Sequence, residues 1–274
     1  MTKTPGAPLV SFQDAGLTVG GRRLWSHLDL GVMPGEFIAI LGPNGAGKTS
    51  MLRAALGLEP LSEGTLSVGG SVPRRGSAAV GYVPQQKIFD RDLALRGRDL
   101  VMLGADGHRF GWPLPSRRVR ADAARMIDAV GASSYADAPV GRLSGGEQQR
   151  LRIAQALMSN PKVLLCDEPL TSLDLSHQEG VLDLLDRRRR DSDSAVLMVT
   201  HEVNPVLPFV DRIVYLAAGN WAVGAPDEIL TSERLTALYG TPIDVLHVRG
   251  RVIVVGAGQT PDASHHCGPI EVSA

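Results

Sequence analysis

The chain has 274 residues, 43% of them hydrophobic, which is enough for one large α/β domain or two small ones. Its net charge of −1 and its two cysteines, Cys166 and Cys267, exclude a strongly basic nucleic-acid-binding protein and a disulfide scaffold. The N-terminus lacks a signal-peptide pattern, and no apolar run reaches the about 18 residues of a membrane-spanning helix. We therefore expect a soluble, cytoplasmic protein unless a partner holds it at a membrane.

The first 90 residues contain two kinds of predicted strand. Residues 9–30 alternate apolar and polar positions around a Gly20-Gly21 turn, and residues 65–83 add strands around Gly69-Gly70. Residues 36–41 form a continuous apolar run instead, which is typical of a buried parallel strand. The pattern predicts an antiparallel β lobe at the N-terminus, joined to a parallel core.

A glycine-rich loop follows the strand at 36–41 and precedes a predicted helix at 50–58. It fits the pattern G-x-x-x-x-G-K-S/T, in which backbone N–H groups surround phosphate oxygens. The lysine supplies positive charge for the β and γ phosphates, and the hydroxyl group suits Mg²⁺. A glycine-rich turn that binds nothing would not need the flanking strand and helix. The predicted phosphate-binding residues are Gly42, Pro43, Asn44, Gly45, Ala46, Gly47, Lys48, Thr49 and Ser50.

The segment from about 90 to 160 changes to helical patterns. Helices are predicted at 98–103 and 119–130, with a loop rich in glycine and proline at 104–116 between them. The octet 143–150 then starts another helix, because Ser144 and Glu147 have the spacing of a capping box. The glycines between them permit close approach of a ligand, and a helix start favours anions.

Two more buried strands end in residues that suit phosphate chemistry. The run 162–166 ends in Asp167 and Glu168, which could hold Mg²⁺ and polarise a water molecule, respectively. The run 195–199 is followed by His201; a lone histidine there is more often structural or exposed. Between these strands, the basic run 187–190 follows a predicted helix, and we expect a solvated helix end, not a nucleic-acid site.

The C-terminal part lies beyond the β/α alternation. Residues 243–248 and 252–255 flank a turn and predict a small β-hairpin. The tail after residue 256 lacks periodicity and carries His265-His266-Cys267, with Asp262 and Glu271 nearby. These side chains could bind Zn²⁺, but an unstructured polar tail is the favoured interpretation.

The order of these motifs resembles that of ATP-binding cassette (ABC) ATPases. The octet 143–150 is similar to their signature motif, 82–85 to their Q-loop, 172–174 to their D-loop, and His201 to their switch histidine. The resemblance implies a P-loop NTPase of the α/β class, with a RecA-like parallel-sheet core, an N-terminal antiparallel β lobe and an inserted helical subdomain at about 90–160. It assigns residues 1–240 to the ATPase domain and residues 241–274 to a C-terminal hairpin and tail.

The resemblance also implies ATP and Mg²⁺ as ligands in a head-to-tail homodimer. In this family, two copies enclose two ATP molecules, each held by the phosphate loop of one copy and the signature of the other. The implied catalytic residues are Lys48, Glu168 and His201; the implied Mg²⁺ residues are Thr49, Gln85 and Asp167; the further nucleotide-binding residues are Gln85, Ser144, Gly145, Gly146, Glu147 and Asp174.

One position departs from the family pattern. The family has an aromatic residue that stacks on adenine upstream of the phosphate loop, and Val19 occupies that position here. Valine can cover the base by apolar contact but cannot stack on it. Phe12 and Trp25 are off register, and core packing is expected for both. The sequence therefore predicts modest discrimination of ATP over GTP.

The family further implies a transport role. Residues 82–90, 99–111 and 200–212 are similar to cassettes of bacterial importers of zinc, manganese or iron. Iron-siderophore and cobalamin importers have similar cassettes, and a soluble ABC ATPase that acts on ribosomes or DNA is a further alternative. The implied partners are integral membrane permease subunits and, indirectly, a solute-binding protein, with this chain on the cytoplasmic face of the membrane. The docking candidates are 85–92 and the loop 104–116.

Overall fold

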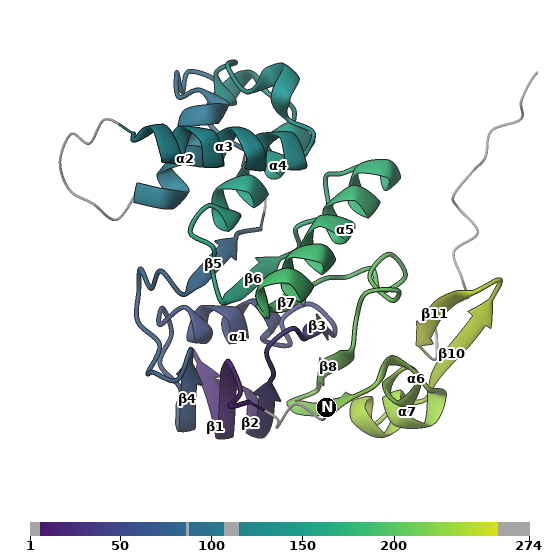
Figure 1. Ribbon diagram of the computed structural model, residues 1–274. Helices are drawn as coiled ribbons and strands as arrows, with labels where there is room; N and C mark the ends of the chain where they lie inside the picture. Colours follow the sequence, from purple (N-terminus) through teal and green to yellow (C-terminus); the bar gives the residue numbers. More distant parts are fainter. Residues whose placement is uncertain (1–5, 86–87, 107–114, 257–274) are drawn as a thin grey trace, which may run out of the picture.

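The computed structural model describes residues 6–85, 88–106 and 115–256 (Figure 1). Its centre is a six-stranded sheet with the order β5-β6-β7-β3-β8-β9. All neighbouring strands of this sheet are parallel except β8 and β9. The strands are β3 (Phe37–Leu41), β5 (Val80–Val83), β6 (Val163–Asp167), β7 (Ala195–Val199), β8 (Arg212–Ala217) and β9 (Asn220–Gly224).

The central strands are apolar throughout because both faces of the sheet are covered. Every residue of β3, β6 and β7 is buried, which explains their continuous apolar runs. The parallel strands end at one edge of the sheet, where ligands of open α/β sheets bind. The phosphate loop, the acidic pair and His201 follow β3, β6 and β7, so the topology brings the three motifs to this edge.

The N-terminal lobe is the predicted antiparallel sheet, with the order β2-β1-β4. The end of the predicted segment 65–83 does not belong to this lobe, because β5 pairs in parallel with β6 in the central sheet. It consists of β1 (Val10–Val19), β2 (Arg22–Val32) and β4 (Glu63–Val68). Phe12 and Trp25 are buried in its core in an edge-to-face arrangement with ring centroids 6.1 Å apart. Their expected packing role is therefore confirmed.

Helices surround the sheet and form a separate layer beyond β5. The helices are α1 (Lys48–Ala55), α2 (Gly97–Asp106), α3 (Arg117–Ala129), α4 (Gly145–Leu157), α5 (Leu175–Ser192), α6 (Pro226–Ile229) and α7 (Ser232–Tyr239). Short 3₁₀ turns, Ser133–Tyr135 and Val140–Arg142, connect α3 to α4. No helix in the described part of the chain is long and apolar enough to cross a membrane.

The predicted loop at 104–116 is wrong at its start, because α2 continues to Asp106. A Cβ on Gly104 would stand 2.0 Å from the carbonyl oxygen of Gln155. Glycine here permits close backbone packing of α2 on α4 and does not mark a loop. Residues 107–114 lie outside the described residues.

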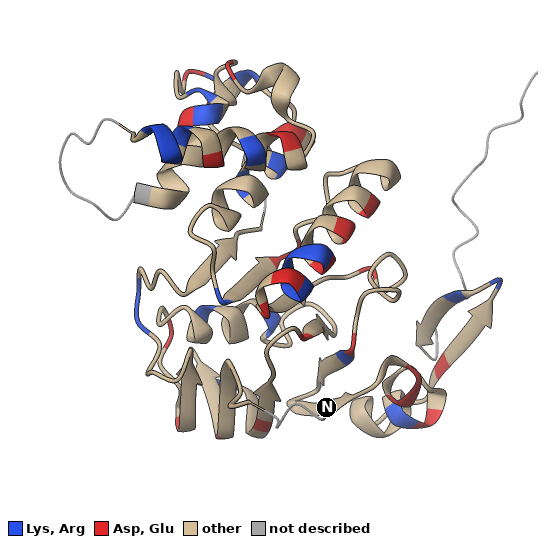
Figure 2. Cartoon of the chain, in the orientation of Figure 1, with Lys and Arg blue, Asp and Glu red and all other residues tan. Residues whose placement is uncertain are grey.

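The basic run at 187–190 is only partly a solvated helix end. Figure 2 shows basic and acidic residues mixed along α5. Arg189 is buried, and its guanidinium lies 2.8 Å from carboxylate oxygens of Asp186 and Asp211. Arg189 therefore connects α5 to the segment before β8 and has a structural role that the charge pattern did not indicate.

The C-terminal hairpin forms as predicted, from β10 (Ile243–Val248) and β11 (Arg251–Gly256). The side chain of Asn204 attaches it to the segment after β7. Its Nδ2 donates to the carbonyl of Val252 (2.9 Å), and its Oδ1 accepts from the Val252 N–H (2.7 Å). The predicted tail and its His265-His266-Cys267 cluster lie outside the described residues.

Candidate functional site

The phosphate loop joins β3 to α1, and its end glycines have conformations that other residues disfavour. Gly42 has φ 138°, and a Cβ there would stand 2.0 Å from the Leu216 carbonyl oxygen. Gly47 has φ 95° and lies against Leu24 and Trp25. These contacts hold the loop between the central sheet and the β lobe, which fixes the direction of its backbone groups.

Lys48 begins α1 and is almost fully buried. Its Nζ donates to the carbonyl oxygens of Gly42 (2.7 Å) and Pro43 (3.0 Å), so the side chain lies along the loop. Burial lowers its pKa, while Glu168 and Asp167 oppose that shift. α1 has no side-chain cap and no acidic residue in its first turn. The start of this helix thus offers N–H groups and a cation to an anion.

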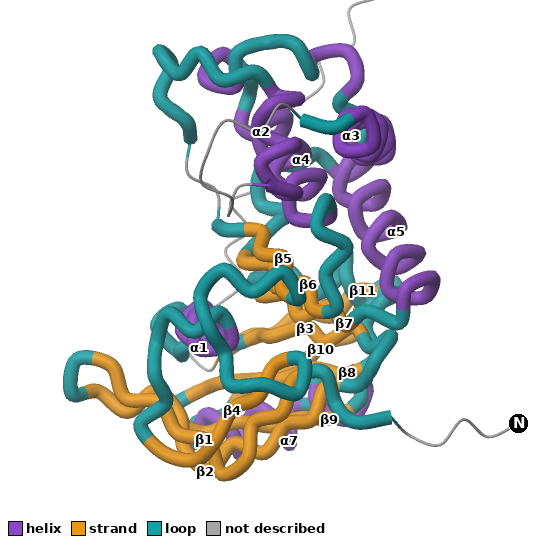
Figure 3. Tube along the Cα trace, turned by 60° about the vertical axis from the view of Figure 1, so that its left-hand side comes forward, coloured by secondary structure: helices purple, strands orange, loops and turns teal. Residues whose placement is uncertain are grey.

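A pocket of about 430 Å³ opens above this loop. Its lining residues come from the β lobe, the phosphate loop, the Q-loop segment and the ends of β6 and β7. Figure 3 traces the backbone of the β lobe, α1 and the central strands. The residues that line the pocket are Val19, Arg22, Leu24, Asn44, Gly45, Gly47, Lys48, Thr49, Ser50, Gln85, Glu168 and His201.

Asp167 and Thr49 form the oxygen-rich end of this site. The Thr49 hydroxyl donates to Oδ1 of Asp167 at 3.1 Å. Burial raises the pKa of Asp167, and the hydrogen bond from Thr49 partly counteracts this. A hydroxyl and a carboxylate this close offer the hard oxygen ligands that Mg²⁺ prefers when it also binds phosphates. The donor set therefore fits a magnesium nucleotide.

Glu168, of the acidic pair, contacts residues of two other predicted motifs, Gln85 of the Q-loop and the switch histidine His201. Its carboxylate accepts a hydrogen bond from Gln85 Nε2 (3.1 Å) through Oε2 and contacts His201 Nε2 through Oε1. Its backbone has φ 49°, which is uncommon for a non-glycine residue, and its N–H donates to the Val199 carbonyl at 2.9 Å. The strand ends thus aim this carboxylate into the pocket.

The signature residues lie in a different pocket, of about 320 Å³. The predicted capping box is present: the Ser144 hydroxyl accepts from the Glu147 N–H at 3.3 Å, and the Ser144 N–H donates to Glu147 Oε2 at 2.7 Å. Gly146 has no room for a Cβ, which would stand 2.8 Å from the Ser172 carbonyl oxygen. This contact fixes the signature against the D-loop segment.

Asp174 borders the signature pocket as the N-cap of α5. It accepts hydrogen bonds from the His177 N–H (3.0 Å) and the Ser176 hydroxyl (2.8 Å), which hold its pKa well below the usual range. The predicted nucleotide-binding residues therefore divide into two groups. In the described part of one copy, a pocket separate from that of the phosphate loop is lined by Ser144, Gly145, Gly146, Glu147 and Asp174.

Two lining residues of the nucleotide pocket were not predicted from the sequence, Arg22 and Leu24. Val19 was predicted and lines the pocket with 39% of its surface exposed. Val19 and Arg22 are cross-strand partners at the end of the β1–β2 hairpin. The signal for Arg22 was the Gly20-Gly21 turn, because a two-residue turn places its flanking residues side by side.

Comparison with known proteins agrees with this geometry. A family model described as ABC transporter matches residues 25–171. A metal-chelate type ABC transporter, solved in an inward-facing conformation, is 28% identical and has a TM-score of 0.74, with 90% of this chain and 95% of that chain covered. A dimeric ATP-binding cassette in a post-hydrolysis state, bound to ADP and phosphate, is 26% identical with a TM-score of 0.68 and covers 79% of this chain and 98% of its own.

CbiO1 from Clostridium perfringens, part of the CbiONQ transporter complex, has the same fold. Its TM-score is 0.68 at 22% identity, over 85% of this chain and 94% of that chain. The family match spans more than half of the chain and contains the phosphate loop, the signature and the acidic pair. The chain belongs to the ABC transporter family, as an ATP-binding subunit with the fold and the ATPase activity of a P-loop ABC ATPase.

Proposed function

We propose that this chain is the ATP-hydrolysing subunit of a membrane importer of metal ions, with zinc, manganese or iron as cargo. The observation that carries the proposal is the separation of two half-sites, a phosphate-loop pocket and a signature pocket with no lining residue in common. Neither half encloses a triphosphate, so a second copy is needed to complete the site. The cargo class is supported by the similarity of residues 82–90, 99–111 and 200–212 to cassettes of zinc, manganese and iron importers.

In the proposed mechanism, one copy binds the nucleotide and the other closes over it. The N–H groups of the phosphate loop and Lys48 hold the β and γ phosphates. Ser144, Gly145 and Gly146 of a second copy cover the γ phosphate with the start of α4, and Glu147 keeps that helix start capped. Asp174 of the second copy positions its D-loop beside the same nucleotide. Binding then shifts the population toward the closed dimer.

The residues around Glu168 perform the hydrolysis step. Glu168 orients the attacking water and accepts its proton, since its carboxylate is aimed into the pocket between Gln85 and His201. His201 contacts the γ phosphate and holds Glu168 in place. Mg²⁺, held by Thr49, Asp167 and Gln85, would neutralise charge on the β and γ phosphates. Loss of the γ phosphate removes the bridge between the copies, which can then separate.

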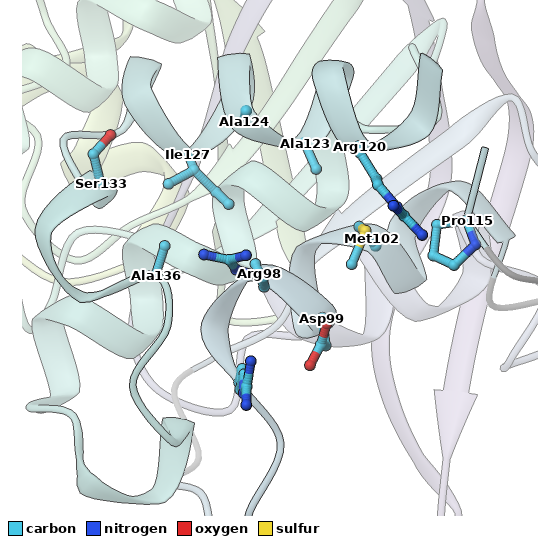
Figure 4. Close-up of a pocket in the computed structure, with 11 residues that line it drawn as sticks. Arg98, Asp99, Met102, Pro115, Arg120, Ala123, Ala124, Ile127, Ser133 and Ala136 are labelled. Carbon is cyan, nitrogen blue, oxygen red and sulfur yellow. The ribbon is translucent and has the colours of Figure 1, made fainter. Parts of the chain in front are cut away.

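We propose that membrane permease subunits bind this chain on the cytoplasmic face of the membrane. The closing and separation of the two ATPase copies would then change the conformation of the permease. The proposed docking surface includes residues 85–92 and 104–116, of which 86–87 and 107–114 lie outside the described part of the chain. A pocket of about 560 Å³ opens between α2 and α3 next to Pro115 (Figure 4). Arg98 and Met102 of α2 lie between this helix and Arg120 and Ile127 of α3, and Asp99 also lines the pocket. Side chains of both charges beside apolar ones suit a protein partner.

A chelated metal is the second candidate cargo, as in siderophore or cobalamin importers. The metal-chelate type of the neighbouring structure favours it. The two candidate cargoes can be distinguished by measuring which of them binds to the solute-binding protein that purifies with the complex. Binding of the free ion alone supports the first candidate, and binding of the chelate alone supports the second.

Co-purification tests the transport role. A tagged chain recovered from detergent-solubilised membranes should bring integral membrane subunits with it, and the charge reversal Arg120→Glu should reduce their recovery while ATP binding persists. Recovery with ribosomes and without membrane subunits would contradict the proposal. A variant with a matched change away from the pocket, Arg187→Glu on α5, serves as the control.

A further inference from the structure

We infer that Arg22 binds the phosphates of the nucleotide and makes affinity depend on the triphosphate more than on the base. The inference rests on the proposed nucleotide site and adds a residue that neither the motifs nor the family match assigns; the matched region begins at residue 25. Three observations carry it: the position of the guanidinium, the absence of a paired carboxylate, and the chemistry of the remaining pocket wall.

The hairpin at the end of β1 and β2 directs Arg22 toward the phosphate loop. Arg22 is the cross-strand partner of Val19, so both side chains lie on the same face of the β lobe, and both line the nucleotide pocket. Nη1 of Arg22 lies 3.7 Å from the point at which a Cβ on Gly45 would stand. Gly45 belongs to the loop whose N–H groups face phosphates, which places this guanidinium on the phosphate side of the pocket.

The charge of Arg22 is available to a ligand. Within the described residues no carboxylate forms an ion pair with it. The next residue behaves differently: Arg23 Nη2 lies 3.9 Å from Glu63 Oε1. Both arginines are exposed, but successive residues of a strand point to opposite faces, so Arg22 and Arg23 have different surroundings. An unpaired arginine beside an anion site can donate a charge-assisted hydrogen bond to a phosphate.

The wall of the pocket offers little that would recognise a base. Its described lining residues include no phenylalanine, tyrosine or tryptophan, and the β lobe contributes only Val19 and Leu24 beside Arg22. Aliphatic side chains cover a purine by area, without a preference for adenine or guanine. The specific contacts in this pocket are therefore cationic and polar groups at the phosphate end. Arg22 adds a second cation to the pocket lining, besides Lys48.

The test is equilibrium binding of nucleotides to the full chain, with Mg²⁺ chelated so that hydrolysis does not contribute. Competition against a fluorescent ATP analogue gives the affinities of ATP, GTP and adenosine for the wild type, Arg22→Ala, Arg22→Lys and the control Arg23→Ala. Loss of one charge-assisted hydrogen bond should weaken ATP and GTP alike by about tenfold in Arg22→Ala. Adenosine should be unaffected, Arg22→Lys should stay within about threefold of the wild type, and Arg23→Ala should match it.

Two results would overturn the inference. The first is an Arg22→Ala protein whose ATP affinity equals that of Arg23→Ala. The second is a loss that is as large for adenosine as for ATP and is not restored by lysine, because that pattern indicates stacking on the base. Failure of the nucleotide site itself would look different, since Lys48→Ala would then leave ATP affinity unchanged in all backgrounds.

Discussion

His201 Nε2 contacts Oε1 of Glu168 across the ends of two neighbouring parallel strands, β7 and β6. Gln85, which follows β5, donates a hydrogen bond to the other oxygen of the same carboxylate at 3.1 Å. Strands β5 and β7, on either side of β6, thus each deliver one polar side chain to the carboxylate that follows β6. A carboxylate held on both oxygens has few orientations left, which is the requirement for a residue that must direct a water molecule.

The buried carboxylate of Asp167 predicts a pH-dependent stability of the nucleotide-free protein. Burial raises the pKa of Asp167 above its ordinary value of 3.8, so the folded state favours the protonated form. Its contribution to stability is greatest below that ordinary pKa and is lost as the pH rises through the folded-state pKa. Asp167→Asn should therefore unfold at a higher temperature than the wild type at pH 7, and the gap should narrow toward about pH 4.

Thermal unfolding without nucleotide or Mg²⁺, at several pH values, measures this difference. A lower unfolding temperature for Asp167→Asn at pH 7 would mean that the charge stabilises the fold, contrary to this account. The same variant should lose Mg²⁺-dependent hydrolysis, which separates the role of the carboxylate in stability from its role in the proposed metal site.

The ion pairs of Arg189 predict that substitution of this one arginine in the run 187–190 causes a large loss of stability. Arg189→Ala removes the buried guanidinium that lies between Asp186 and Asp211 and donates to the carbonyls of Gly35 and Phe209. The substitution leaves Asp186 paired only with the exposed Arg190 and leaves two backbone carbonyls without this donor, which should lower the free energy of unfolding by about 3 kcal/mol. The exposed neighbour in Arg187→Ala should change it by less than about 0.5 kcal/mol. Urea unfolding gives the free energy of unfolding of both variants. Equal values would contradict a structural role for the buried side chain of Arg189.

The structural roles of Arg189 and Gly104 could not be predicted from local sequence patterns. The phosphate loop, the capping box and the buried strands follow from local spacing, and the structure places all of them where the sequence predicted. The fate of Arg189 depends on Asp211, 22 positions further on, and that of Gly104 on the backbone of α4. Contacts between distant segments leave no local sequence pattern. The sequence therefore predicted a solvated helix end for the run that contains Arg189 and a loop for the segment that begins at Gly104.

The candidate site was predictable to a similar extent. Motifs identified Lys48, Thr49, Asp167, Glu168 and His201, because phosphate chemistry needs particular residue types at particular strand ends. Arg22 carried no such mark, since an arginine after a turn is ordinary on a surface. Only the pairing of β1 with β2, and the closeness of that hairpin to Gly45, place it in the pocket.

The phosphate-loop glycines predict different outcomes for two alanine substitutions. Gly42→Ala would bring a Cβ to 2.0 Å from the Leu216 carbonyl oxygen at φ 138°. Such a clash with backbone should destabilise the fold by about 3 kcal/mol or more. Gly20→Ala, at φ 59° with open space around it, should lose only about 1 kcal/mol. Denaturant unfolding distinguishes them, and similar losses at both sites would show that the loop can move away from β8.

The pocket wall predicts weak discrimination between purine bases. Val19 has no ring to stack on adenine, so ATP and GTP should be hydrolysed at comparable rates. Val19→Tyr should raise ATP affinity and the preference for ATP over GTP. Steady-state phosphate release with each nucleotide gives both quantities. A GTP rate below about one hundredth of the ATP rate in the wild type would contradict the prediction.

The mass of the Glu168→Gln protein in the presence of ATP and Mg²⁺ tests the central claim, that two copies complete each nucleotide site. Glutamine preserves the shape of the side chain but is a far weaker base, so hydrolysis should fall by at least about 100-fold while ATP still binds. Light scattering after size exclusion should then give a dimer with ATP and a monomer without it. A protein that binds ATP with wild-type affinity and remains monomeric would contradict the account.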